Sequence, residues 1–289
     1  MQWQGVFPAI TTPFDEGYAV DHAALRAHAR WMIDEGCEGV IPLGSLGEAS
    51  TLAFDEKVAI LTTCVAAVDR PVVASVSASS TAEGIALARA AEKAGCAALM
   101  VLPPYVYRGD DREIETYFGA VIGATRLPCM LYNNPIAYGT DVVPGGVARL
   151  AARHANLTAI KESSTDVRRV TEIRRLLGDR LAILVGVDDA IVEGMEAGAV
   201  GWVAGLVNAF PRESVELHAC VRDGKTAEAR ALYEWFLPLL RLDTVPKFVQ
   251  LIKFVQAERG RGDARVRPPR LELDDAERSA VRELLAVAR

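Results

Sequence analysis

The chain has 289 residues, half of them hydrophobic, which suffices for one large domain or two small ones around a sizeable buried core. Its formal net charge of −6 argues against nucleic acid or an anionic membrane as a partner, because both attract basic surfaces. The five cysteines form no C-x-x-C pair, which is typical of a reducing compartment. With no signal-type segment and no apolar stretch of the ~18 residues that a membrane span needs, we expect a soluble, cytoplasmic protein.

Eight short runs rich in Val, Ile and Leu recur along the chain. They do not alternate strictly between apolar and polar residues, which is typical of strands buried on both faces of a parallel sheet. The predicted strands span residues 6–10, 39–43, 71–76, 97–102, 128–132, 157–160, 181–185 and 199–203.

The segments between these runs have the amphipathic pattern of helices, for example residues 21–35, 55–68, 81–94 and 110–125. The residues predicted to cap helix starts are Asp21, either Ser80 or Thr81, and either Asp110 or Asp111. Glycines stand where helices should end, at Gly36, Gly95, Gly178 and Gly198. Eight strand–helix units with right-handed crossovers predict an α/β fold of the TIM (β/α)₈ barrel type. A doubly wound sheet is the alternative, but the first predicted strand is not followed by its glycine-rich phosphate turn.

The chain continues after the eighth unit with three more predicted helices, at residues 225–242, 244–259 and 274–288. Pro246 and the pair Pro268-Pro269 separate them, since proline interrupts helices. We therefore expect residues 1–223 to form the barrel and residues 224–289 to form a helical extension packed on it.

Lys161 is the most informative of the strand-end residues, because active sites of such barrels lie at the C-terminal ends of the strands. It ends the sixth predicted strand, whereas the other five lysines fall on helical or loop segments. Burial in a barrel mouth disfavours the charged ammonium, and a neutral amine attacks carbonyl groups. The alternative is a structural lysine paired with a carboxylate such as Glu162 or Asp188, and spacing alone favours neither.

Two further strand ends carry groups that suit the same chemistry. Tyr132 ends the fifth predicted strand, beside Lys161 in barrel order, where a phenol can move protons during attack on a carbonyl. Its alternative role is that of an aromatic lid with a bonded hydroxyl. The segment Gly44-Ser45-Leu46-Gly47-Glu48 follows the second strand, and its glycines can turn backbone N–H groups towards an anion such as a carboxylate. A plain turn is the alternative there.

Nothing in the sequence indicates a metal or an organic cofactor. The four histidines fall on predicted helices or just after one, and neither H-E-x-x-H nor a cysteine cluster occurs. The pair Asp188-Asp189 could hold Mg²⁺, but two adjacent acids are weak support for a metal site. We expect no metal and no cofactor.

Taken together, the strand ends resemble the dihydrodipicolinate synthase and N-acetylneuraminate lyase family. The matching segments are Phe7-Pro8-Ala9 with Thr12-Pro13-Phe14, Gly44-Ser45-Leu46-Gly47-Glu48, Tyr132-Asn133-Asn134-Pro135 and Lys161-Glu162-Ser163-Ser164. The resemblance covers nearly the whole chain. It implies that Lys161 forms a Schiff base with a small 2-oxo acid and that Tyr132 relays protons. It also implies that Gly44, Ser45 and the backbone of Leu46 bind the substrate carboxylate, and that the Val203 carbonyl and Tyr105 line the pocket.

Three departures from the synthase pattern bear on the substrate. Leu46 replaces the second of two threonines, and Val106, flanked by Tyr105 and Tyr107, replaces a tyrosine. Ala137 stands where the synthase has an arginine for the carboxylate of its second substrate. Alanine cannot make that charge-assisted contact, so aspartate semialdehyde is disfavoured as the second substrate.

Residues 132–135, 201–205 and 267–270 are similar to those of deaminases that act on 1-pyrroline-4-hydroxy-2-carboxylate. Their substrate has one carboxylate and a neutral distal hydroxyl, so no second arginine is required. A 2-keto-3-deoxy sugar acid aldolase, 4-hydroxy-tetrahydrodipicolinate synthase, a non-catalytic binder of 2-oxo acids and a metal-dependent barrel aldolase are the alternatives. The resemblance also implies a homo-oligomer, either a tetramer or a dimer.

Overall fold

The structure is a computed structural model that describes residues 1–287. Within this range a parallel seven-stranded sheet has the strand order β1-β7-β6-β5-β4-β3-β2. The strands are β1 (Gly5–Pro8), β2 (Val73–Val76), β3 (Ala98–Val101), β4 (Cys129–Asn133), β5 (Leu157–Glu162), β6 (Ala182–Val185) and β7 (Gly201–Ala204). Each matches one of the predicted runs, and nearly every strand residue is buried, which confirms the expected parallel arrangement.

The predicted second strand, residues 39–43, is reduced to single bridges that join both edges of the sheet. Ile41 bridges to Ala9 beyond β1, and Val40 bridges to Val72 before β2. The Ile41 N–H donates to the Pro8 carbonyl at 2.8 Å. Pro42 has no N–H to continue the ladder, and Leu43 has a φ of 66°, which turns the backbone out of the extended conformation. The expectation of eight full strands was therefore wrong at this position.

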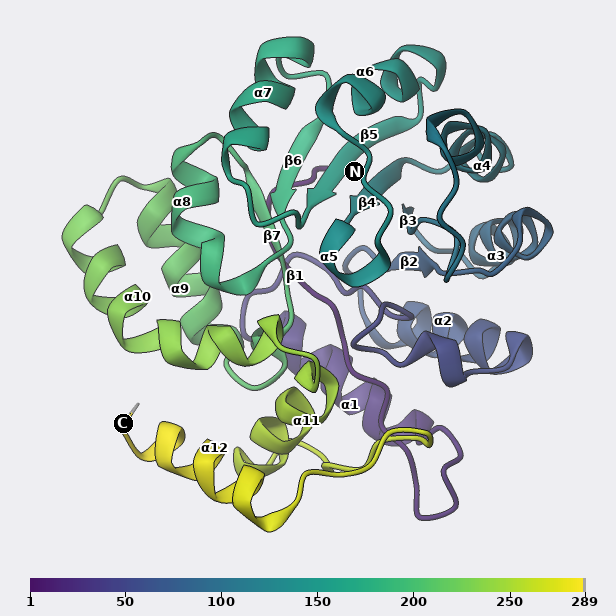
Figure 1. Cartoon of the computed structure of the whole chain (residues 1–289). Helices are drawn as coiled ribbons and strands as arrows, with labels where there is room; N and C mark the ends of the chain where they lie inside the picture. The colour runs from purple at the N-terminus through teal and green to yellow at the C-terminus, as the bar shows by residue number, and fades with distance from the viewer. Residues whose placement is uncertain (288–289) are drawn as a thin grey trace.

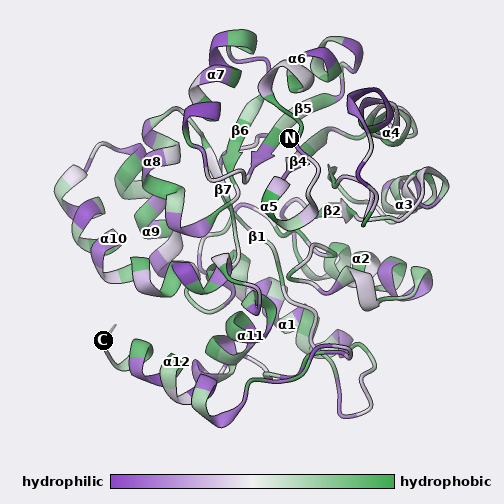
Figure 2. Cartoon of the chain, in the orientation of Figure 1, coloured by the Kyte–Doolittle hydropathy of each residue, from purple (hydrophilic) through white to green (hydrophobic). Residues whose placement is uncertain are grey.

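Helices surround the strands (Figure 1). Those between strands are α1 (His22–Asp34), α2 (Phe54–Ala67), α3 (Thr81–Lys93), α4 (Asp111–Gly123), α5 (Pro135–Tyr138), α6 (Pro144–Arg153), α7 (Arg168–Leu177) and α8 (Ile191–Glu196). After β7 come α9 (Pro211–Arg222), α10 (Thr226–Leu240), α11 (Phe248–Glu258) and α12 (Asp275–Val287). Hydrophilic and hydrophobic residues alternate along these helices in Figure 2, as expected for helices with one buried face.

The predicted helix caps are confirmed in their details. Asp21 accepts hydrogen bonds from the N–H groups of Ala23 and Ala24. Ser80, not Thr81, caps α3, and Asp110, not Asp111, caps α4, each by accepting the N–H three residues ahead. The glycines predicted to end helices all have positive φ: Gly36, Gly95, Gly178 and Gly198.

The C-terminal helices differ from their predicted bounds at the proline-containing turn. The predicted helix at 244–259 begins only at Phe248, because Pro246 interrupts the hydrogen-bond pattern ahead of it. A short 3₁₀ turn, η4 (Arg241–Thr244), links α10 to α11. Of the predicted helix 274–288, the last residue lies outside the described range. Across residues 1–287 no helix is both long and apolar enough to cross a membrane.

Candidate active site

A cavity of about 470 Å³ opens at the C-terminal ends of the strands. All seven residues singled out from the sequence line it: Lys161, Tyr132, Gly44, Ser45, Leu46, Val203 and Tyr105. Two other hollows of similar size lie over α3–α4 and over the α11–α12 linker, but neither is lined by Lys161 or Tyr132. The strand-end cavity is therefore the candidate active site.

Lys161 and Tyr132 are brought together by the register of the sheet. Tyr132 on β4 pairs directly with Lys161 on β5, so both side chains leave the sheet at the same level. The Lys161 Nζ lies 4.2 Å from the centroid of the Tyr132 ring, and both residues are buried. The Tyr132 hydroxyl accepts a hydrogen bond of 3.0 Å from the Asn134 side chain. This arrangement places an amine and a phenol side by side on one wall of the cavity.

The two carboxylates proposed as structural partners of Lys161 are occupied elsewhere. Glu162 accepts hydrogen bonds from the Ser164 N–H at 2.6 Å and from the Asn133 side chain at 3.2 Å. Asp188 accepts from the Trp202 indole at 3.0 Å and from the N–H groups of Gly205 and Leu206. In residues 1–287 no carboxylate forms an ion pair with Lys161.

Burial raises the pKa of both acids. It raises the pKa of Asp188 to about 6, although its three hydrogen-bond donors and the nearby Lys161 oppose the shift. Burial also raises the pKa of Glu162, against the hydrogen bonds from Ser164 and Asn133. Asp188 thus connects the end of β7 to the loop after it, because Trp202 lies before Val203 while Gly205 and Leu206 lie after it.

Tyr138 is a cavity residue that sequence reasoning missed. Its hydroxyl is hydrogen-bonded to the Ser45 hydroxyl. Its ring packs edge-on against Tyr132 at 5.7 Å and against Tyr105 at 6.4 Å. Burial raises the pKa of the Tyr138 phenol well above its ordinary value. The only sequence signal was a tyrosine at the end of the helical turn that follows Tyr132-Asn133-Asn134-Pro135.

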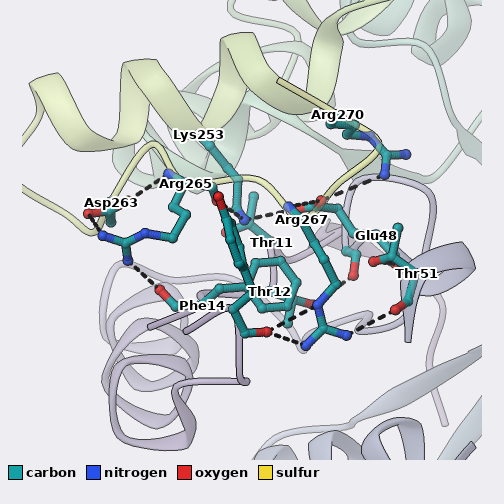
Figure 3. A network of polar contacts seen from close by, with 12 residues as sticks. Thr11, Thr12, Phe14, Glu48, Thr51, Lys253, Asp263, Arg265, Arg267 and Arg270 are labelled. Atoms are coloured by element: carbon teal, nitrogen blue, oxygen red, sulfur yellow. Dashed lines mark hydrogen bonds and ion pairs between the residues drawn. The ribbon is translucent and has the colours of Figure 1, made fainter. Parts of the chain in front are cut away.

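Glu48, at the end of the loop of residues 44–48, lies among charged residues of the C-terminal segment (Figure 3). Glu48 is fully buried and has a left-handed backbone, with φ of 56°. Its carboxylate accepts from the Lys253 ammonium at 2.7 Å and from the Arg267 N–H at 3.0 Å, and it lies 3.6 Å from Arg270. Burial lowers the pKa of Lys253, while Glu48 opposes that shift. The ion pair joins the candidate carboxylate-binding loop to α11.

The sequence analysis predicted no role for Lys253 or Arg270 in the site. Lys253 is a lone charge in the apolar stretch Leu251-Ile252-Lys253-Phe254-Val255, a sign of a buried partner. Arg270 lines the cavity from the linker before α12, so an arginine is present although Ala137 is not one. Ala137 also lines the cavity, and its N–H donates a hydrogen bond to the Asn134 side chain. Val106 is 82% exposed and is not part of the lining.

No group of three or more metal-binding side chains occurs in residues 1–287. The four histidines lie on α1 and α9 or directly after α6, and none of them lines the cavity. Burial lowers the pKa of His28 to about 4, and its ring is hydrogen-bonded to Asn208 at 2.8 Å. His22 is hydrogen-bonded to Thr63 of α2 at 2.8 Å.

Comparison with known proteins identifies the family of the chain. The sequence profile of the Dihydrodipicolinate synthetase family matches residues 2–288. The chain belongs to this family. A 4-hydroxy-tetrahydrodipicolinate synthase from Methanothrix thermoacetophila is 36% identical over 248 residues, 84% of each chain. Family membership confirms the resemblance drawn from the strand-end motifs.

Solved structures of the family have the same fold. The 4-hydroxy-tetrahydrodipicolinate synthase from Methylacidiphilum fumariolicum SolV superposes with a TM-score of 0.95 at 30% identity, covering 99% of this chain and 96% of that one. A prophage protein of the dihydrodipicolinic acid synthase family from E. coli K12, in complex with pyruvate, superposes with a TM-score of 0.94. It is 28% identical and covers 100% of this chain and 99% of that one.

Proposed function

We propose that the protein is a lyase that forms a Schiff base between Lys161 and the C2 carbon of a small 2-oxo acid or cyclic imine acid. The observation that carries this proposal is the buried Lys161 amine, which projects into the cavity beside a phenol while Glu162 and Asp188 bind other donors. An amine held in this way is available for attack on a carbonyl or imine carbon. The pyruvate bound to the E. coli relative supports a 2-oxo acid as ligand.

The remaining cavity residues have complementary roles in this reaction. Tyr132 pairs with Lys161 in the sheet, so its hydroxyl is close enough to transfer protons to and from the carbinolamine. Ser45 and the N–H of Leu46 bind the substrate carboxylate, with Gly44 leaving room for its approach. The Val203 carbonyl and the Tyr105 ring complete the wall. Asn134 and Tyr138 orient the Tyr132 and Ser45 hydroxyls.

The scaffold in this proposal is a (β/α)₈ barrel of residues 1–223, closed by residues 39–43, with the extension 224–289 packed on it. The bridges from Val40 and Ile41 to both sheet edges support closure. α10 and α11 contact α9 and the turn after β7, which supports an extension docked on the barrel. We also propose a homo-oligomer, either a tetramer or a dimer, which light scattering tests.

For the substrate we propose 1-pyrroline-4-hydroxy-2-carboxylate, which the enzyme would deaminate. Lys161 attacks the ring imine, and the ring nitrogen leaves C2 as an amine on C5. Loss of the C4 hydroxyl as water and a shift of the double bond give an imine at C5. Two waters then hydrolyse this imine and the Schiff base, which releases ammonia and the semialdehyde. Ala137 favours this substrate, since it offers no cation to a second carboxylate. The second candidate is 4-hydroxy-tetrahydrodipicolinate synthase, supported by the names of the relatives and by Arg270 in the lining. An aldolase acting on a 2-keto-3-deoxy sugar acid would share the first steps.

Steady-state assays with the three substrates, with and without a chelator, decide among these functions. The proposal predicts ammonia release from the pyrroline, at a rate that the chelator does not change. Condensation of pyruvate with aspartate semialdehyde at a higher kcat/KM would establish the synthase instead. Loss of activity with the chelator would establish a metal-dependent lyase.

A further inference from the structure

Asp243 brings a carboxyl group from the C-terminal extension into the cavity. It lies on η4, between α10 and α11, and lines the same cavity as Lys161. The carboxyl group lies directly over Gly205, just after β7. A Cβ at position 205 would clash with it, since even the farther oxygen, Oδ2, would be 2.8 Å away. The glycine thus makes room for this carboxyl group among the strand ends.

The surroundings of Asp243 are acidic and poor in hydrogen-bond donors. Within residues 1–287 its side chain has neither a hydrogen bond nor an ion pair. Asp188 is committed to Trp202 and two backbone N–H groups, and Asp189 lies 3.6 Å from Arg241. Burial and the charge of Asp188 raise the pKa of Asp243 well above its usual range, with a smaller contribution from Asp189, while Lys161 opposes the shift. Asp243, which is half-buried, therefore holds its proton to a higher pH than an ordinary aspartate does.

A second polar group in the cavity also lacks a partner. The Ser163 hydroxyl is buried, lines the cavity and has no hydrogen bond. Gly186 leaves room for this hydroxyl and for Lys161, because a Cβ there would clash with both side chains. Buried polar atoms are normally bonded, so the unpaired hydroxyl indicates a polar ligand group at this end of the cavity.

The proposed binding mode places the rest of the substrate near these groups. With the carboxylate on residues 44–46 and C2 on Lys161, the carbons from C3 onward extend into the remaining part of the cavity. That part is lined by Ser163 and Asp243. A hydroxyl group on C4 would thus meet an acid and a second hydroxyl.

We propose that Asp243 is the acid that protonates the hydroxyl group leaving from C4 of the substrate bound to Lys161. This step rests on the proposed Schiff-base function. The imine loses a C3 proton to solvent, and the resulting enamine electrons form the C3–C4 double bond as the C4–O bond breaks. The oxygen takes the proton of Asp243 and leaves as water, and Asp243 regains a proton from solvent.

The same geometry specifies the class of substrate. Breaking the C3–C4 bond of an aldol requires a base that removes the C4 hydroxyl proton, whereas breaking the C4–O bond requires an acid. Asp243 supplies the acid. The substrates are therefore 2-oxo or cyclic imino acids with a hydroxyl group on C4 that is lost as water, and not aldols that are cleaved between carbons.

Borohydride trapping tests this step separately from Schiff-base formation. Wild type, Asp243→Asn and the control Asp189→Asn are each incubated with pyruvate, with a five-carbon 4-hydroxy-2-oxo acid or with the pyrroline. The adduct on Lys161 is then weighed by mass spectrometry. Asparagine keeps the shape of the side chain but cannot release a proton. Asp189 lies outside the cavity lining, so its variant controls for a lost charge nearby.

The inference predicts pyruvate adducts of equal yield in all three proteins. In wild type and Asp189→Asn, the adduct of the 4-hydroxy acid should be lighter by one water than the adduct that keeps its hydroxyl group. In Asp243→Asn it should retain the water, with dehydration slowed about 10²- to 10⁴-fold. Equal dehydration rates in Asp243→Asn and wild type, or an intact hydroxyl in the wild-type adduct, would overturn the inference. Absence of the pyruvate adduct itself would overturn the proposed function.

Discussion

Replacing Lys253 with methionine tests whether the C-terminal segment holds the loop of residues 44–48. Methionine keeps the length of the apolar stem and removes the ammonium that lies 2.7 Å from Glu48. Both side chains are buried, with 2% and 0% exposure. Removing one partner of a buried ion pair typically costs roughly 3–5 kcal/mol, because the other charge stays buried without compensation.

The structure places the expected loss at the lower end of that range. After the substitution the Glu48 carboxylate keeps the Arg267 N–H at 3.0 Å, and Arg270 remains 3.6 Å away. We therefore expect the free energy of unfolding to fall by about 3 kcal/mol, which lowers Tm by roughly 5 °C for a chain of this size. The substrate loop should also lose its position, so that KM for the 2-oxo acid rises more than kcat falls.

Thermal and urea unfolding measure the stability change, and steady-state kinetics measure the change in KM. Lys247→Met is the matched control, because its ion pair with Glu277 is partly exposed and should be worth less than about 1 kcal/mol. The double variant Lys253→Met with Glu48→Gln should recover part of the stability by removing the isolated charge. If Lys253→Met is as stable as Lys247→Met and has an unchanged KM, the ion pair does not hold the loop.

Four further predictions concern the site and its supports. Tyr132→Phe should lower kcat about 10²- to 10⁴-fold without loss of Tm; an unchanged kcat would exclude the phenol from proton transfer. His28 has its pKa lowered to about 4, so its contribution to stability is complete above pH 6.5 and is lost as pH falls towards 4, by up to about 3 kcal/mol. Urea unfolding of His28→Gln should accordingly vary less over that pH window than wild type does. Gly205→Ala should displace Asp243 and lower the dehydration rate at unchanged pyruvate adduct yield; full activity would show that the carboxyl group is not needed there. Ala137→Arg should raise the rate with aspartate semialdehyde and lower that with the pyrroline, and no change in the ratio of the two rates would show that position 137 does not select the substrate.

The parts of the fold that follow from local rules could be predicted from the sequence. Apolar runs became strands, and Asp21, Ser80 and Asp110 became caps, because period, burial and capping are set by neighbouring residues. Residues 39–43 do not form a full strand, because Pro42 has no N–H to donate to the neighbouring strand. The prediction gave more weight to the apolar composition of this run than to its proline.

The core of the candidate site could be predicted for a different reason. Barrel topology brings strand ends together, so Lys161, Tyr132 and Ser45 could be grouped before any distance was known. The groups that were missed come from far along the chain. Lys253 meets Glu48 across 205 residues, and Asp243 reaches Gly205 from the C-terminal extension. No spacing rule encodes such contacts, because they depend on how the extension docks.

Schiff-base formation by Lys161 can be observed by trapping with pyruvate and borohydride. Borohydride reduces a protonated imine to a stable amine, so digestion and mass spectrometry locate the modified lysine. We expect a single adduct on Lys161 and none in the folded Lys161→Arg variant. An adduct on another lysine such as Lys57, or no adduct in folded wild type with pyruvate or larger 2-oxo acids, would contradict it.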